Sequence, residues 1–150
     1  MSEMQLDLKG MDELQEAMKK AIAKYPGTAE EHLEKAGKSF KKRVLKITDS
    51  AVDRHTGNLK KGYKLSPVKA FGTRMYIEFS GTAKHFHLIE NGHNQVLPKR
   101  RKGKETKNGG AVVGFVPGRL IVKQARAEYQ EKMPQLMEEM VDDIIKRSGL

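Results

Sequence analysis

The sequence predicts an α+β fold, because apolar residues follow a helical spacing at both ends of the chain and a strand alternation in its middle. Helical spacing covers much of residues 6–51 and returns after residue 119, whereas residues 63–80 alternate between apolar and polar side chains. Helices, then strands, then a helix is the order of an α+β protein rather than of alternating βαβ units. We therefore expect N-terminal helices, a small and mostly antiparallel sheet with a long basic loop, and a C-terminal helix packed on the sheet. With 150 residues, the chain is expected to form a single domain, residues 1–150.

Two helices are predicted in the N-terminal third. Tyr25-Pro26-Gly27 separates them, because proline disfavours helix in the residue before it and glycine supplies a turn. Thr28 then matches the N-cap of a capping box, with Glu31 three residues on, and the second helix is expected to end near Asp53. The apolar stripe of the first helix is Leu6, Leu8, Met11, Leu14, Met18 and Ile22. That of the second is Leu33, Ala36, Phe40, Val44, Ile47 and Ala51.

The predicted strands follow from alternation with a period of two. Apolar residues alternate with polar ones from Tyr63 onward and again from Met75 to Ser80, with turns expected at residues 71–74 and 80–83. Strands at 85–90 and 112–116 complete the predicted sheet.

A final helix is predicted after Pro117-Gly118, and Pro134 should kink or restart it. Its methionines follow helical spacing and are expected to fill either the core or a subunit interface. Its apolar stripe is Leu120, Ile121, Ala125, Tyr129, Met133, Leu136, Met137, Met140, Val141, Ile144 and Ile145.

The most strongly charged segment is residues 98–110, which hold six cationic side chains and one anionic, a net +5 of the chain's +10. We expect residues 93–111 to form a flexible basic loop between two strands, and such a loop in a compact domain is either functional or ordered by a partner. The charge favours an anionic partner, either DNA or an acidic protein surface. No aromatic residue is present in this segment to stack on bases. Its cations are Lys99, Arg100, Arg101, Lys102, Lys104 and Lys107.

Composition excludes several classes of protein. The chain has no cysteine, which removes disulfides, thiolate metal sites and cysteine nucleophiles. No apolar run approaches the ~18 residues that span a bilayer, and the N-terminus lacks the pattern of a signal peptide, so we expect a soluble protein made in the cytoplasm. With 37% hydrophobic and 32% charged residues, a thin core under a charged surface fits a subunit that gains stability from its neighbours.

The histidines allow one metal hypothesis. His85 and His87 would share a face of the predicted strand, with Glu90 and His93 nearby, as in a zinc or iron site. The alternation favours instead polar histidines on an exposed face. No nucleophile elbow, phosphate loop or His-Glu-x-x-His motif is present. We expect no enzymatic activity, no cofactor and no metal.

Three short patterns carry a resemblance: Arg54-His55-Thr56-Gly57-Asn58-Leu59, the segment His87–His93, and Phe115-Val116-Pro117-Gly118-Arg119. In this order and spacing, from about residue 35 to residue 147, the chain resembles the small head–tail joining, neck or tail-completion (minor tail component) proteins of tailed bacteriophages. It departs from them in having His55 between Arg54 and Thr56, and in the length and charge of the segment after Gly92.

The resemblance implies a virion structural protein, a head–tail connector or tail-completion subunit in a ring at the neck. Its partners would be neighbouring copies, the portal or connector, a tail-tube or tail-terminator protein, and nonspecific DNA in the channel, with no membrane. It would be found in the virion neck or tail, and in the host cytoplasm during assembly. The alternative is a stand-alone basic nucleic-acid-binding domain.

Physical reasoning assigns structural roles to residues of the three patterns, and the role of Glu90 rests on its charge and position. Gly57 should adopt a positive φ at the exit from the long helix, and Leu59 should anchor that corner in the core. Glu90 should pair with a cation, Arg54 or Arg119, and Pro117-Gly118 should set the angle of the final helix. The residues assigned in this way are Thr56, Gly57, Leu59, Glu90, Gly92, Pro117 and Gly118.

Overall fold

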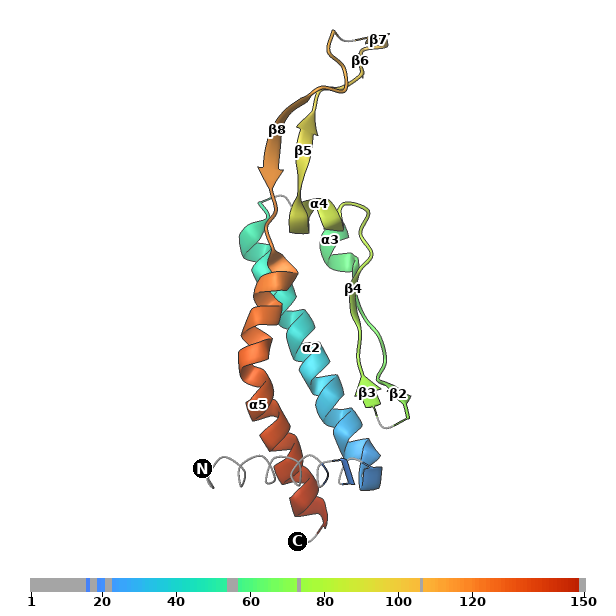
Figure 1. The fold of residues 1–150 in the computed structure, drawn as a ribbon, viewed down its shortest axis with the longest axis vertical. Coiled ribbons are helices and arrows are strands. Elements are labelled where there is room, and N and C mark those ends of the chain that lie inside the picture. Colours follow the sequence, from blue (N-terminus) through green and yellow to red (C-terminus); the bar gives the residue numbers. More distant parts are fainter. Residues whose placement is uncertain are drawn as a thin grey trace, which may run out of the picture. The chain divides into compact units, whose positions relative to one another are not determined.

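The computed structural model describes residues 16, 19–20, 23–53, 57–72, 74–105 and 107–148. It confirms the α+β class (Figure 1). The helices are α2 (Pro26–Ala51), α3 (Asn58–Lys61), α4 (Phe86–Asn91) and α5 (Ile121–Ser148). The strands are β1 (Tyr63–Leu65), β2 (Lys69–Phe71), β3 (Arg74–Tyr76), β4 (Phe79–Gly81), β5 (Gly92–Val96), β6 (Arg100–Arg101), β7 (Lys104–Glu105) and β8 (Val112–Pro117). The apolar stripe predicted for the first helix lies outside the described residues.

The strands form two-stranded pairs: β1 with β4, β2 with β3, β5 with β8, and β6 with β7. The last three pairs are antiparallel. Met75, Ile77 and Phe79 are half-buried and the residues between them are exposed, which confirms the predicted alternation. The predicted turn at 71–74 is also confirmed, because Phe71 pairs with Arg74 across it.

The strand predicted at 85–90 is wrong, since residues 86–91 form α4. These six residues also fit a helix, because Phe86 and Ile89 are three positions apart and so share one helical face. Tertiary contacts favour the helix. The ring of Phe86 packs edge-on against that of Tyr63, with centroids 6.0 Å apart. The strand that pairs with β8 is β5, so the range 93–111 begins with a strand rather than a loop.

The described residues group into two compact units. Unit 1 comprises those within 1–42, 65–79 and 128–150, and unit 2 comprises those within 43–64 and 80–127. The organisation as a single domain stays a prediction.

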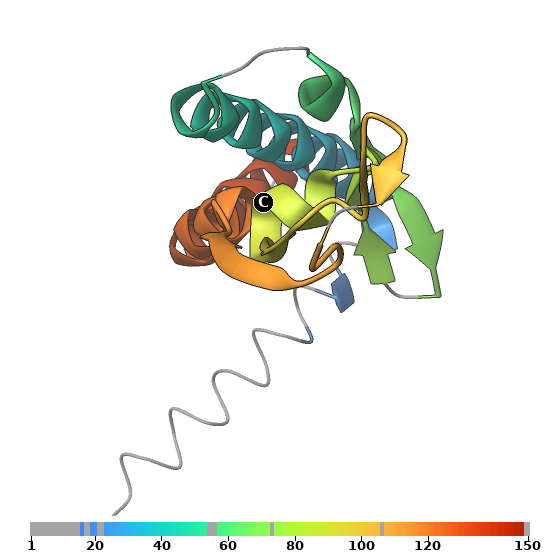
Figure 2. The ribbon, with the colours of Figure 1, turned by 90° about the horizontal axis from the view of Figure 1, so that it is seen from above.

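In unit 1, α2 and α5 lie side by side and antiparallel (Figure 2). Ala29, Met140 and Ile144 form the buried cluster, and Tyr25 and Met75 pack against it. Met75 comes from β3, so the C-terminal helix packs on the sheet as predicted.

The start of α2 differs from the prediction, because the helix begins at Pro26 and Thr28 is not its N-cap. Proline is tolerated in the first helical turn, where the backbone N–H groups have no partner within the helix. Thr28 is buried, and its hydroxyl accepts a hydrogen bond of 3.2 Å from the guanidinium of Arg147. At the other end of the chain, α5 continues through Pro134, so the predicted restart does not occur.

In unit 2, the buried residues with side chains are Val44, Ile47, Thr48, Tyr63, Ile121 and Ala125, and Gly62 is buried as well. The hydroxyl of Thr48 donates to the carbonyl of Val44 at 2.8 Å, so the hydroxyl of Tyr63, 3.1 Å from Thr48, is the donor of that pair. Burial raises the pKa of Tyr63, and the negative charge of Glu90 also raises it. The neutral Tyr63 hydroxyl therefore contributes its full stabilisation below pH 10, the ordinary pKa of tyrosine. This contribution is lost as the pH rises through the raised pKa of the folded state.

Asp143 in unit 1 gives a pH-dependent prediction. Its carboxylate lies 3.0 Å from Nε2 of His32 and 3.2 Å from the guanidinium of Arg147. The hydrogen bond from His32, with the charge of Arg147, lowers the pKa of Asp143 below its ordinary value of 3.8. A group with a lowered pKa stabilises the fold above the pKa of the unfolded state, and this contribution is lost as the pH falls through the folded pKa.

We expect Asp143→Asn to lower the melting temperature at pH 7, and the difference from wild type to shrink as the pH falls below about 4. The control is Asp142→Asn, an exposed neighbour with no ion pair among the described residues. Thermal unfolding followed by circular dichroism at several pH values measures both. A difference that persists undiminished in acid would contradict the assigned role.

Candidate assembly site

Residues 92–117 of unit 2 form an extended ribbon, which we call the arm (Figure 1). Its shaft is the antiparallel pair β5–β8, and its tip is residues 98–110, which contain the hairpin β6–β7. Beyond Val96 the two legs stay joined, because the N–H of Leu97 donates to the carbonyl of Ala111 at 3.0 Å and that of Gly110 to the carbonyl of Leu97 at 2.9 Å. The segment predicted as a loop is thus hydrogen-bonded well beyond the shaft.

One face of the shaft is apolar and exposed. Paired residues share a face of a ribbon and successive residues alternate between faces. Phe115 pairs with Asn94 and Val112 pairs with Val96, two residues further along β5, so these four share a face. A register shift between Gln95 and Val96 makes this possible, because it adds one residue to β8. Phe115 is 62% exposed, Val112 60% and Val96 50%.

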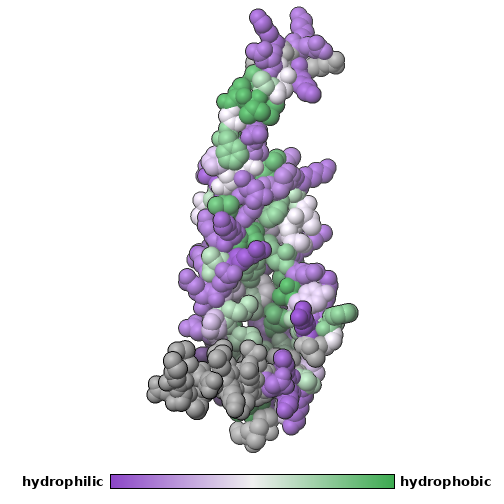
Figure 3. Space-filling view, in the orientation of Figure 1, coloured by the Kyte–Doolittle hydropathy of each residue, from purple (hydrophilic) through white to green (hydrophobic). Residues whose placement is uncertain are grey.

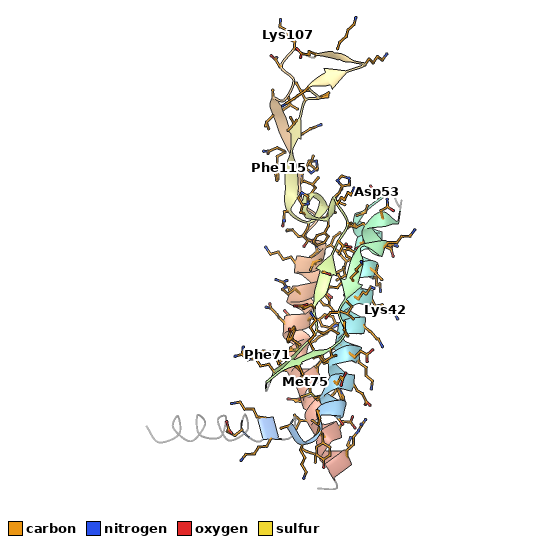
Figure 4. All side chains as sticks on the ribbon, turned by 90° about the vertical axis from the view of Figure 1, so that its right-hand side faces the viewer. Lys42, Asp53, Phe71, Met75, Lys107 and Phe115 are labelled. Carbon is orange, nitrogen blue, oxygen red and sulfur yellow. The ribbon has the colours of Figure 1, made fainter. Side chains whose placement is uncertain are left out.

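The figures show the same division of the arm. Figure 3 shows hydrophobic side chains on the shaft next to the hydrophilic tip. Figure 4 places Phe115 on the shaft and Lys107 at the tip. The patch is rimmed by polar residues, which is typical of an interaction surface.

The tip carries all six predicted cations within residues 99–107. Arg100 pairs with Glu105 and Arg101 with Lys104 along the hairpin, and Lys102 and Gly103 form its turn. Both turn residues have positive φ, 51° and 80°, as a type I′ turn requires. Lys99, Lys102, Lys104 and Lys107 are exposed. The tip therefore presents a concentrated positive charge to the solvent.

The segment before the arm caps the N-terminus of α5. The carboxylate of Glu90 accepts the N–H of Val122 at 3.1 Å and the N–H of Lys123 at 3.0 Å. Its carbonyl accepts the N–H of Leu120 at 3.1 Å, and the carbonyl of Ile89 accepts the N–H of Arg119 at 2.7 Å. A carboxylate in this position satisfies free N–H groups and complements the helix dipole.

Glu90 thus pairs with a helix N-terminus, and the predicted ion pair with Arg119 is not formed. The other predicted partner, Arg54, lies outside the described residues. Sequence reasoning missed the cap because no local signal joins residues more than thirty positions apart.

Two of the three sequence patterns, the segment His87–His93 and the segment 115–119, meet at the base of the arm. A Cβ atom on Gly118 would lie 2.2 Å from the carbonyl oxygen of Glu90, and one on Gly92 would lie 2.5 Å from that of Val116. Gly92 also has φ +82°, which favours glycine. Residues of two separate patterns therefore meet in one backbone crossing: Glu90 and Gly92 from the segment His87–His93, and Gly118, with Pro117 of β8 beside it, from the segment 115–119.

Gly57 and Leu59 lie elsewhere in unit 2. Gly57 has φ +74°, which confirms the predicted positive φ, and it precedes α3. Leu59 is half-buried and lines a cavity of about 560 Å³ with Val52 and Ile89. Thr56 lies outside the described residues.

Unit 1 has a second exposed apolar surface, which we call the groove. It has a volume of about 650 Å³. Phe71 at the β2–β3 turn is 81% exposed, Tyr76 41% and Met137 38%. Figure 4 shows Phe71 near the hairpin turn and Met75 on the same hairpin. Sequence reasoning assigned Phe71 only to a turn, although an aromatic residue in a turn is a signal of a contact surface. The lining residues are Ala29, Leu33, Phe71, Arg74, Met75, Tyr76, Met137 and Met140.

The histidines do not share a strand face, because His85 precedes α4 and His87 lies within it. Within the described ranges, no group of three histidine, aspartate or glutamate side chains is placed to hold a metal ion. Nδ1 of His93 is buried and has no hydrogen-bond partner there. None of the helices in the described part is long and apolar enough to cross a membrane.

A comparison with protein families gives a match over the first part of the chain. The model described as "Bacteriophage HK97-gp10, putative tail-component" matches residues 11–92, a range that includes the Gly57 motif and Glu90 and ends where the arm begins. Neither the curated proteins nor the solved structures gave a match. Because the family match covers more than half of the chain, this protein belongs to the HK97-gp10-like family of bacteriophage tail components.

Proposed function

We propose that the protein is a head–tail connector or tail-completion subunit that assembles into a ring at the neck of the virion. Membership of a phage tail-component family supports a structural role. The observation that carries the proposal is the exposed apolar shaft of the arm. A two-stranded ribbon is at best marginally stable in water, and an apolar face of this kind is covered in an assembly.

A ring requires two different surfaces on each subunit. A heterologous contact joins one surface of a subunit to another surface of the next, and it closes when the rotation between copies divides a full turn. The arm and the groove are two such surfaces on one chain. In this role the protein acts through its surfaces and has no catalytic site. Its neighbours in the neck are the portal or connector on one side and a tail-tube or tail-terminator protein on the other. Host cytoplasm is its location during assembly.

Native mass spectrometry across protein concentration tests the ring. We expect one discrete oligomer larger than a dimer, with a mass that is a whole multiple of 16.9 kDa. An open series of masses would indicate a contact that does not close, and monomers alone at all concentrations would contradict self-assembly. Tight and sequence-selective binding of duplex DNA by the monomer at physiological salt would instead support a stand-alone nucleic-acid-binding domain.

A further inference from the structure

We propose that the apolar face of the arm and its basic tip together bind the N-terminal segment, residues 1–24, of a second copy of this chain. The inference rests on the proposed function, because it names a contact that would join neighbouring subunits of the ring. It assigns an occupant to the apolar face of the shaft, which the isolated chain leaves exposed, and an anionic partner to the tip.

The arm has two kinds of surface that follow one another along its length. The shaft presents the apolar face that contains Phe115, Val112 and Val96. The tip beyond it carries a net charge of +5. A partner that covers both therefore needs an apolar part followed by an acidic part. The length to be covered, from Asn94 on the shaft to Lys102 at the turn, is at most about 26 Å at the rise of a strand.

The N-terminal segment has these two parts in its sequence. Residues 1–13 contain four acidic side chains and one lysine, a net −3 in a chain of net +10. After them the apolar stripe of the predicted first helix continues with Leu14, Met18 and Ile22, at steps of four residues. A helix over residues 3–22 is about 30 Å long, which is close to the length of the arm to be covered.

The described positions of the segment belong to its polar face. Wherever residues 16–24 are described, they are helical and exposed. Glu16 and Lys20 are each two residues from Met18, which is about 200° around a helix, so the predicted stripe lies on the opposite face. An isolated helix of this length is marginal in water, and most helices gain their stability by packing an amphipathic face. The segment therefore gains stability from a partner for its stripe.

The charges give the segment one orientation on the arm. Asp12 and Glu13 precede the end of the stripe, whereas Lys19 and Lys20 lie beside it. With its acidic end at the tip, the segment places opposite charges together and keeps its lysines away from the cations of the tip. Opposite charges across an interface guide docking and set its register.

Other occupants meet only one of the two requirements. Phosphates of DNA would neutralise the tip, but a phosphate backbone offers nothing to the apolar face of the shaft. The exposed acids Glu138 and Asp142 of α5 share a polar helix face with Gln135. The groove is apolar, and its one charged lining residue, Arg74, has the same sign as the tip.

The segment and the arm are also two different surfaces of one chain. Each copy can therefore give its segment to one neighbour and receive a segment from the other, which is the heterologous contact that a ring requires.

Because the chain contains no cysteine, engineered cysteines report the contact directly. Met18→Cys and Phe115→Cys are made as separate variants, mixed and treated with a short bismaleimide. We expect a covalent dimer that neither variant gives alone, and a ladder of multimers when both cysteines are in one chain. The matched control replaces Met18→Cys by Lys20→Cys, on the exposed polar face of the segment, and it should crosslink several-fold more slowly.

Charge reversal tests the acidic end of the segment. Asp12→Lys with Glu13→Lys in the segment, or Lys102→Glu with Lys104→Glu on the tip, should each weaken self-association by about tenfold or more at low salt. The four changes combined in one chain should restore much of it, because the opposite charges then face each other again. Native mass spectrometry at two salt concentrations measures the association.

The control for the reversal in the segment is Glu138→Lys with Asp142→Lys, which changes the charge of the chain by the same amount on α5. Both positions are exposed, so circular dichroism should show an unchanged fold, and self-association should change little. If this control weakens association as much as the reversal in the segment, and the segment does not crosslink, the tip binds α5 and the inference is wrong.

The remaining outcomes separate this inference from the ring itself. Discrete oligomers without the Met18–Phe115 crosslink, and without rescue by the combined reversal, would overturn the docking and leave the ring intact. A crosslink that forms only within one chain, at every protein concentration, would place the segment on its own arm and overturn the exchange between copies. Monomers alone, with no crosslink, would overturn both. Duplex DNA binding that is lost on reversal of the tip charges, with self-association unchanged, would assign the tip to DNA and overturn the docking.

Discussion

Replacing Gly118 with alanine is expected to lower the free energy of unfolding by roughly 3 kcal/mol, as overpacking against a rigid neighbour does. The added Cβ atom would lie 2.2 Å from the carbonyl oxygen of Glu90 and 2.5 Å from the carbonyl carbon of Asn91. Both are backbone atoms, so no side-chain rotation relieves the overlap. The chain would have to separate at the base of the arm, where Glu90 contacts the start of α5.

The matched control for this substitution is Gly27→Ala. A Cβ atom there meets nothing within 4 Å, and Gly27 lies in the first turn of α2. Alanine is favoured over glycine in a helix by up to about 1 kcal/mol, so this variant should be as stable as wild type or slightly more stable. Urea unfolding measures both variants. Equal stability of Gly118→Ala and wild type would show that the close crossing is absent in solution.

Replacing Glu90 with alanine is expected to cost about 2 kcal/mol, in the upper part of the range for the loss of a helix cap. Two backbone N–H groups, those of Val122 and Lys123, lose their acceptor, and the start of α5 loses a negative charge. Glu90→Gln should fall between alanine and wild type. Its amide oxygen can still accept a hydrogen bond, whereas its NH₂ group would face an N–H donor.

Glu131→Ala is the control for Glu90. Glu131 is an exposed carboxylate of the same helix, with no hydrogen bond or ion pair among the described residues. Its removal should change stability by less than about 0.5 kcal/mol. If Glu90→Ala and Glu131→Ala unfold at the same urea concentration, the carboxylate of Glu90 does not cap α5.

Periodicity predicted the elements whose sequence signal is long. The stripe from Leu33 to Ala51 is a helix, the alternation around Met75 is a half-buried strand pattern, and residues 112–117 are a strand. It failed over residues 85–90, where six residues fit both periods and the packing of Phe86 on Tyr63 favours the helix. It also failed at Thr28, where a capping-box pattern matched but proline starts the helix two residues earlier.

By itself, the sequence determined the class of the fold, the family and the charge of the tip, because these depend on residue types and on their local spacing. Only the tertiary structure decided what the motif residues do. Glu90 and Val122 are distant in the chain, and their contact depends on how the backbone crosses at Gly92 and Gly118. The apolar face of the arm likewise depends on one extra residue in β8, which brings Val112 and Phe115 to the same side. Register and long-range contacts are properties of the folded chain, and no local pattern encodes them.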